Sequence, residues 1–353
     1  YTSPHTLSLH DALPILTDLI IMVEKQSYMF LTGPEVIKSV TGEIVDFETL
    51  GGAATHLGVS GLAHLTAPSE KDALALLRTV LGYLPSNGME NAPLAACDDD
   101  PNRMDEELNH LVPDDRNLPY SMHEAIQRIV DRGSFTELQA SFAPHAIIGF
   151  ARMGGQSVGI VSQEPEHMAG VMDIDSSDKI SRFVRLCDCY NLPIVTFTDC
   201  PGFLPGTNQE HGGVIRHGAK VLFAYSEAVV PKINVITRKA YGGAYIVMSS
   251  KMMGADVSFA WPSAEVAVMG PEGAANILFR KQIEAAEDPS AERARLVEDY
   301  RKRFLTPYAA AALGYIDDVI EPRETRSRVI AALIALRNKA VTPLPRKHGN
   351  MPV

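Results

Sequence analysis

Two glycine-rich segments carry the strongest chemical signal in this sequence. The first is CPGFLPG, residues 200–206, which follows the apolar run IVTFTD; the second is YGGAY, residues 241–245, which follows INVITRKA. Each lies between a run typical of a buried strand and a helical pattern. A glycine turn before a helix exposes backbone N–H groups that can stabilise a negatively charged oxygen. The pattern indicates an oxyanion site, although a plain strand-to-helix turn gives the same local signal.

Three common motifs for catalysis or for phosphate and dinucleotide binding are absent. The sequence has no GxSxG nucleophile elbow, no Walker A lysine loop and no GxGxxG after a strand. His217 could be a base, but we expect a helical histidine bonded to the backbone. Glu210 and Glu265 could be acids, but we expect each to cap a helix or to pair with an arginine.

The cysteines argue against a metal site. They are Cys97, Cys187, Cys189 and Cys200. None forms a CxxC pair or a cysteine–histidine spacing typical of zinc, so we predict no metal. Free, buried thiols in a reducing cytoplasm are the simplest interpretation.

Composition excludes one class of partner. The chain has 353 residues, 46% of them hydrophobic and 21% charged, which is typical of a globular protein with a large core. Its formal net charge is −11. Because nucleic-acid binding requires a basic surface, we predict no nucleic-acid partner.

Strand and helix patterns alternate along most of the chain, which predicts a mostly parallel α/β architecture. A helix is expected at 69–84, with Leu74, Leu77 and Leu81 on one face, and another at 122–132. Two β-rich runs meet at Gly154 and Gly155, which predicts a hairpin. Residues 1–15 are predicted to be a leader foreign to the fold, neither signal peptide nor membrane span. Residues 85–119 have the composition of a linker, which places a domain boundary between residues 16–110 and 111–353.

Several stretches resemble one family of enzymes. The segment from FVRLCDCYNLPIVTFTD through KAYGGAYIVMSS to GPEGAANILFR closely resembles the β subunit of propionyl-CoA carboxylase and its relatives, which include the methylmalonyl-CoA decarboxylase α subunit. FLTGPEVIKSVTGE, TLGGAATH, SGLAH and the closing PRKHGNMPV are also similar to that family. The resemblance covers residues 17–353, and at this length and density it is not a coincidence.

The resemblance implies a crotonase-like (ClpP-like) ββα superhelix used twice. Residues 111–353 would form a complete carboxyl-terminal carboxyltransferase domain, and residues 16–110 a remnant of a similar amino-terminal domain. In the family, an SGGARIQEG-type loop of the amino-terminal domain holds the acyl-CoA thioester enolate. That loop would precede Thr17, so the resemblance implies an amino-terminal truncation.

The resemblance also assigns the glycine-rich segments. The family's second oxyanion pair, which acts on carboxybiotin, matches Gly243 and Ala244. The residues expected to line the same pocket are Gly202, Phe203, Leu204, Gly242, Tyr245 and Ile246. Ile246 departs from the pattern, because members resembling propionyl-CoA carboxylase usually have Asp there. An apolar side chain at this position predicts a less strict choice between acetyl-CoA and propionyl-CoA.

The implied activity is transfer of a carboxyl group between carboxybiotin and a short acyl-CoA. Biotin would be carried by a partner biotin carboxylase and carrier subunit, and CoA would enter with the substrate. Self-association into the family hexamer and a cytoplasmic location are also implied. Two alternatives remain: a methylmalonyl-CoA decarboxylase or transcarboxylase subunit, and an inactive fragment or scaffold that lacks the acyl-CoA loop.

Overall fold

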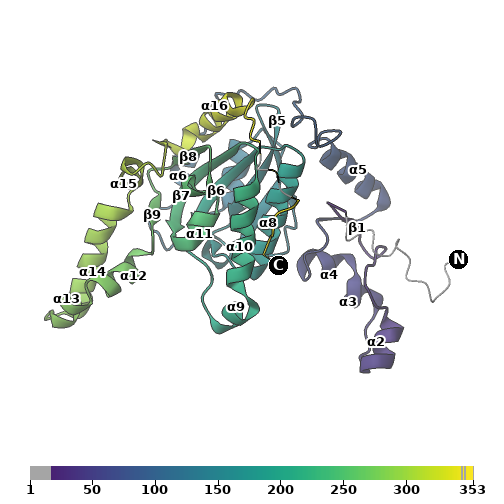
Figure 1. The fold of residues 1–353 in the computed structure, drawn as a ribbon, viewed down its shortest axis with the longest axis horizontal. Coiled ribbons are helices and arrows are strands. Elements are labelled where there is room, and N and C mark those ends of the chain that lie inside the picture. The colour runs from purple at the N-terminus through teal and green to yellow at the C-terminus, as the bar shows by residue number, and fades with distance from the viewer. Residues whose placement is uncertain (1–16, 343–344, 346, 353) are drawn as a thin grey trace. The chain divides into compact units, whose positions relative to one another are not determined.

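The computed structural model describes residues 17–342, 345 and 347–352, which divide into two compact units (Figure 1). The first unit contains the described residues up to Gly82 together with Glu137–Pro144. The second contains Tyr83–Thr136 and the described residues from His145 onward. The predicted leader, residues 1–15, lies outside the described residues. The predicted boundary at residues 110 and 111 stays a prediction.

The first unit is a small parallel sheet with four helices. Strand β1 (Ile21–Val23) pairs with β2 (Leu65–Ala67), and the helices are α2 (Pro34–Thr41), α3 (Phe47–Gly51), α4 (Ala53–Gly58) and α5 (Glu70–Leu81). The Ser69 side chain accepts a hydrogen bond from the backbone N–H of Asp72, so the predicted start of α5 is confirmed. The three leucines of its predicted apolar face are largely exposed: Leu74 (54%), Leu77 (41%) and Leu81 (57%).

The second unit is built on a mostly parallel sheet. Its strands include β4 (Ala146–Met153), β5 (Gln156–Gln163), β6 (Ile194–Cys200), β7 (Lys232–Tyr241), β8 (Val257–Ala260) and β10 (Asp318–Val319). The order across the sheet is β10-β8-β7-β6-β5-β4, and β9 (Glu265–Ala267) pairs with the far end of β7. Only β4 and β5 in this set are antiparallel; they are joined by Gly154 and Gly155 at φ 60° and 82°. These positive φ values fit a type I′ hairpin turn, so the predicted hairpin is confirmed.

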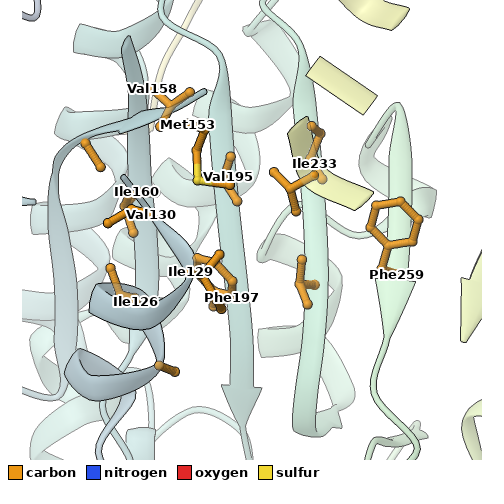
Figure 2. Close-up of a cluster of buried hydrophobic side chains, with 14 of the residues drawn as sticks. Ile126, Ile129, Val130, Met153, Val158, Ile160, Val195, Phe197, Ile233 and Phe259 are labelled. Atoms are coloured by element: carbon orange, nitrogen blue, oxygen red, sulfur yellow. The ribbon is translucent and has the colours of Figure 1, made fainter. Parts of the chain in front are cut away.

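Helices cover the sheet because its strands are apolar along most of their length. The principal helices are α7 (Met122–Ile129), α8 (Ile174–Cys189), α10 (Val214–Glu227) and α16 (Thr325–Leu336). Figure 2 shows part of the main core, in which Ile126 and Ile129 of α7 belong to one cluster with Val195, Phe197 and Ile233 of the central strands. Each of these five side chains is fully buried. Burying such a side chain stabilises the fold by about 1.5–3 kcal/mol.

A series of short helices follows β9 in the sequence. These are α12 (Pro271–Leu278), α13 (Arg280–Ala285), α14 (Pro289–Tyr300), the π-helical turn η3 (Arg301–Leu305) and α15 (Pro307–Ala312). In Figure 1, α12, α13 and α14 lie beyond β9, to one side of the sheet. In the described part of the chain, no helix is long and apolar enough to cross a membrane.

The segment predicted to be a linker, residues 85–119, is fastened to the second unit. Its only helix is α6 (Leu108–Leu111), yet the backbone N–H of Ala95 donates to the Gly155 carbonyl at 2.9 Å. The guanidinium of Arg326, 1% exposed, donates to the carbonyls of Asp99 and Asp100 at 3.2 and 3.0 Å. A buried guanidinium needs these acceptors, so this part of the chain is not a free linker.

The cysteines are all free, but they do not share one environment. Cys187 and Cys200 are buried, and burial raises the pKa of both thiols, that of Cys200 to about 12. Cys189 is exposed at the end of α8, so the prediction of buried thiols is wrong at that position. The reason is helical geometry, because positions i and i+2 point to different faces.

A buried acid fixes the start of α8 to His145, the residue that precedes β4. The Asp173 carboxylate accepts from the backbone N–H of Ser176 at 2.8 Å, and the Ser176 hydroxyl accepts from the Asp173 N–H, which completes a capping box. Nε2 of His145 lies 3.0 Å from the same carboxylate. Burial alone would raise the pKa of Asp173, but the hydrogen bonds from His145 and Ser176 outweigh it and lower the pKa to about 2.

This lowered pKa predicts an acid-sensitive contribution to stability. The ionised carboxylate stabilises the fold above the unfolded-state pKa near 3.8, and the contribution is lost as the pH falls through about 2. We expect Asp173→Asn to lower the free energy of unfolding at pH 7 by about 2 kcal/mol, and to flatten its pH dependence below pH 4. Urea unfolding between pH 7 and pH 3 measures both, with exposed Asp98→Asn as the control. A variant as acid-sensitive as the wild type would contradict the assignment.

Candidate active site at the carboxyl end of the sheet

The two glycine-rich segments begin side by side. Strands β6 and β7 are parallel, and Cys200 at the end of β6 is in register with Ala240 of β7. The register shifts between Thr198 and Cys200, just before the first glycine loop. Irregularities of this kind re-aim the chain and are common next to active sites. The structure therefore brings both predicted segments to one edge of the sheet.

A buried ion pair joins these strand ends. The Nε of Arg238 lies 2.9 Å from Oδ2 of Asp199, and the side chains are 4% and 0% exposed. The other carboxylate oxygen of Asp199 accepts from the backbone N–H of Lys239 at 3.0 Å. Arg238 also donates to the Leu118 carbonyl at 2.8 Å and lies over the ring of Tyr120, 4.8 Å from its centroid. The pair thus links β6 and β7 to each other and to the segment before α7.

The second glycine segment forms the start of a short helix, α11 (Gly242–Val247). Gly242 has φ 62°, and a Cβ there would lie 3.1 Å from the Val268 carbonyl, so the position requires glycine. Gly243 is exposed, and a Cβ on it would meet nothing within 4 Å. No side chain caps this helix, and the first N–H groups of a helix have no acceptor inside it. Open space therefore adjoins Gly243, whereas Ala244 is fully buried, and donation by the backbone N–H groups of both residues to a ligand stays a prediction.

Tyr245 and Ile246 face the core side of α11. Tyr245 is 3% exposed within an apolar cluster that includes Ile236 and Val266, and Ile246 packs against the same cluster while remaining half-buried. The Tyr245 hydroxyl has no hydrogen-bond partner among the described residues, and burial, with a smaller effect of Tyr315, raises its pKa to about 12. Contact of Tyr245 or Ile246 with a ligand stays a prediction.

The first glycine segment is held from both sides. Gly202 and Gly206 have φ 143° and 137°, and neither would bring a Cβ within 4 Å of another residue. The ring of Phe203 lies against α10, because a Cβ on Gly218 would be 2.7 Å from its Cζ. The backbone N–H of Leu204 donates to the Met172 carbonyl at 2.7 Å, and the Met172 N–H donates to the Gly202 carbonyl at 3.0 Å. Phe203 and Leu204 remain half-buried, and their role as a pocket wall stays a prediction.

A strained turn that the sequence analysis missed lies beside this loop. Met168, Ala169 and Gly170 have consecutive positive φ values of 49°, 54° and 71°. A Cβ on Gly170 would lie 2.7 Å from the Asp199 carbonyl, so the turn abuts the end of β6. Left-handed residues that are not glycine cluster at functional sites. Only the glycine of HMAG hints at the turn, since Met and Ala carry no turn signal.

Two of the three candidate acids and bases have charged partners, and the third is exposed. The Nδ1 of His217 lies 2.9 Å from the Asp178 carboxylate, which also binds Lys220 at 2.7 Å. The expected bond from His217 to the backbone is therefore wrong, because a carboxylate on α8 faces it. The expected arginine partners of Glu265 are confirmed: Oε1 lies 2.6 Å from Arg116 and 3.2 Å from Arg301. Glu210 is exposed on α9 (Thr207–Gly212).

Among the described residues, the feature that marks this α/β sheet is the pair of glycine turns at the carboxyl ends of β6 and β7. The chain belongs to the carboxyl transferase domain family, which it matches over residues 12–351. The predicted family and the crotonase-like α/β fold are confirmed.

Particular relatives are similar over almost the whole chain. It is 54% identical to the propionyl-CoA carboxylase carboxyltransferase subunit of Haloferax mediterranei and 57% identical to the methylmalonyl-CoA decarboxylase subunit alpha of Veillonella parvula. Each alignment covers 96% of the chain and 66% or 65% of the relative. The structure superposes on the transcarboxylase 12S crystal structure with methylmalonyl-CoA bound, with a TM-score of 0.93 and 49% identity, over 96% of this chain and 65% of that one. The chain thus spans slightly less than two thirds of these relatives.

The buried pair gives a stability prediction. Arg238→Met leaves the Asp199 carboxylate buried without its counter-charge, which should destabilise the second unit by about 3–5 kcal/mol. The double variant Asp199→Asn, Arg238→Met removes the charge as well and should recover part of that loss. Urea unfolding measures both, with the exposed pair member Arg295→Met expected to change stability by less than about 1 kcal/mol. Equal losses in the single and double variants would show that the ion pair is not what holds the strand ends.

Proposed function

We propose that this chain provides a carboxyltransferase site that moves a carboxyl group between biotin, carried by a partner, and a short acyl-CoA. The observation that carries the proposal is the turn at Gly242–Gly243–Ala244, where an uncapped helix begins at the carboxyl end of β7 with open space beside Gly243. Family membership supports the same chemistry, and one similar structure has methylmalonyl-CoA bound.

The residues around this turn fit the flat ureido ring of biotin. The ring can approach a backbone amide closely only where no Cβ intervenes, and Gly243, Gly202 and Gly206 all leave that space open. Phe203 and Leu204 are apolar and half-buried, as expected for one wall of such a pocket. Biotin, when bound in its carboxylated form, supplies the carboxyl group and then a base for the acyl-CoA α-proton.

The protein's part is to position the reactants and to stabilise charge. The N–H groups of Gly243 and Ala244 can donate to an oxygen that becomes negatively charged during transfer, and donors fixed in the backbone need no reorganisation as that charge develops. The apolar wall can exclude water, which would otherwise capture the carboxyl group. No side-chain base is required, in agreement with the partners found for His217 and Glu265.

The direction of carboxyl transfer defines a second candidate function. The identity of 57% to a methylmalonyl-CoA decarboxylase subunit favours transfer from a carboxylated acyl-CoA to biotin as much as the reverse. One site can serve both directions, so the partner decides: a biotin carboxylase favours carboxylation, and a membrane decarboxylase subunit favours decarboxylation. A chain that neither binds biotin nor turns over acyl-CoA would be a scaffold instead.

We further propose that biotin arrives on a separate carrier subunit in the cytoplasm and that the protein self-associates. The similar transcarboxylase 12S structure is described as a hexamer. In the family as implied by the resemblance, an active site forms between the amino-terminal domain of one subunit and the carboxyl-terminal domain of another.

Gly243→Val tests the proposed site. The side chain would enter the open space, so the fold should be retained while close approach to the amides is blocked. Loss of one oxyanion donor typically lowers kcat by ~10²–10³. We expect a fall of this size in biotin-dependent carboxyl transfer, measured in the full-length subunit, with an unchanged melting temperature. Wild-type turnover in the variant would refute the assignment of Gly243.

Ile246 offers a test of substrate choice. Ile246 lies in α11, two residues after Ala244, and is half-buried, so part of its side chain is available to border a ligand. Replacing the family's usual Asp by Ile removes a charge and changes the shape of the wall. Because a methylene in an apolar pocket is worth only ~1–3 kcal/mol, the bias between short acyl groups should be modest.

We expect Ile246→Asp to favour propionyl-CoA over acetyl-CoA relative to the wild type, by up to ~10-fold in the ratio of kcat/KM. Bulky branched unsaturated acyl-CoAs should be poor substrates of both proteins. The ratio is measured by steady-state assay of the two substrates. An unchanged ratio would mean that Ile246 is a packing residue only.

A further inference from the structure

A buried polar network lies directly behind the Gly242 turn. Its centre is Glu265, the first residue of β9, which is 4% exposed. Its Oε2 accepts a hydrogen bond from the hydroxyl of Tyr241, the residue that immediately precedes the turn. Its Oε1 lies 2.6 Å from Nη1 of Arg116 and 3.2 Å from Nε of Arg301. Oε2 is therefore hydrogen-bonded to Tyr241, whereas Oε1 is paired with the two arginines by charge alone.

Tyr241 connects this network to the amide donors. It is the N-cap residue of α11 and is 7% exposed. Its backbone is also in register with Ala267 of β9, two residues beyond Glu265. Burial, and then the Glu265 charge, raise the pKa of Tyr241, so the hydroxyl stays protonated as a donor. Backbone pairing and the side-chain bond thus fix the same residue to the same short strand.

Arg301 extends the network to the helices beyond β9. It begins the π-helical turn η3 at the end of α14, a feature that often marks a functional position. Besides Glu265, its guanidinium lies 3.3 Å from Glu272 at the start of α12 and 3.2 Å from Glu298 of α14. Loss of Glu265 would leave the buried Tyr241 hydroxyl without its acceptor, which is costly. It would also remove the charge that Arg116 and Arg301 share, although Arg301 keeps its bonds to Glu272 and Glu298.

We propose that Glu265, acting through the Tyr241 hydroxyl, is a positioning residue that holds the backbone N–H groups of Gly243 and Ala244 in the geometry that carboxyl transfer requires. The proposal rests on the carboxyltransferase function proposed above. Gly242 has no Cβ and can adopt many conformations, so the turn itself does not fix where its amides point. The residue on its amino-terminal side must supply that constraint, and Tyr241 is held by Glu265.

Two variants test the role of Glu265. Tyr241→Phe removes only the hydroxyl, and Glu265→Gln removes the charge while keeping the shape. Loss of one buried hydrogen bond predicts backbone hydrogen exchange about two- to tenfold faster in the peptide 242–248. In the full-length subunit, kcat should fall ~10–100-fold as the donors shift, with KM for acyl-CoA almost unchanged. Tyr308→Phe, which removes an exposed hydroxyl on α15, is the matched control and should change neither quantity.

The two readouts separate this proposal from the proposed function. Exchange in 242–248 that matches the wild type in both variants would overturn the positioning role, whatever the activity. Faster exchange together with no carboxyl transfer by the wild-type subunit would refute the function and leave the structural link standing. A fall in kcat with normal KM, together with faster exchange, would support both. A rise in KM alone would also overturn the proposal, because it would place Glu265 in substrate binding.

Discussion

The ion pair between Asp199 and Arg238 is the constraint on which the site depends. Both residues lie near the ends of their strands, and both side chains are buried, with Arg238 4% exposed and Asp199 0% exposed. A buried charge without a partner is costly, so each residue restricts the other to one position. The Asp199 carboxylate also accepts from the Lys239 backbone, so β6 and β7 must end in one relative register. The loop at 201–206 and the turn at Gly242 can then start only side by side.

Two glycine turns begin at the resulting edge. Glycine at 242 permits a left-handed turn, and glycine at 243 leaves space beside the amides. The charged residues Asp199, Arg238 and Glu265 lie on the strands next to these turns and form buried ion pairs that hold the strands and turns in place. Such an arrangement suits a reaction in which a reactant acts as the base, while the protein positions the reactants and stabilises charge with backbone dipoles.

The sequence predicted the framework because the local signals were strong. Alternating apolar strands and helices indicated the parallel sheet, Gly154 and Gly155 indicated the hairpin, and Ser69 indicated the start of α5. Family resemblance located the turn at Gly243. Long-range contacts carry no such signal: nothing near Arg326 shows that it binds the carbonyls of residues 99 and 100, far away in the chain. The segment 85–119 was therefore mistaken for a linker.

The same limit applies to the site. A charged residue at the end of each of two buried strands was visible in IVTFTD and INVITRKA, but only the register shows that Asp199 meets Arg238. The strained turn at Met168 and Ala169 had no signal, because its conformation is imposed by packing against the end of β6. The contact of His217 with Asp178 was not predictable for a similar reason, because α8 and α10 come together only in the folded chain.

The most direct test of the central claim is transfer of labelled carboxyl groups. The full-length subunit would be incubated with methylmalonyl-CoA labelled in its free carboxyl group and with a biotinylated carrier domain. A carboxyltransferase site predicts label on the carrier, dependent on biotin, and unlabelled propionyl-CoA in equal amount. Label that remains on methylmalonyl-CoA, with carrier and subunit both folded, would contradict the account.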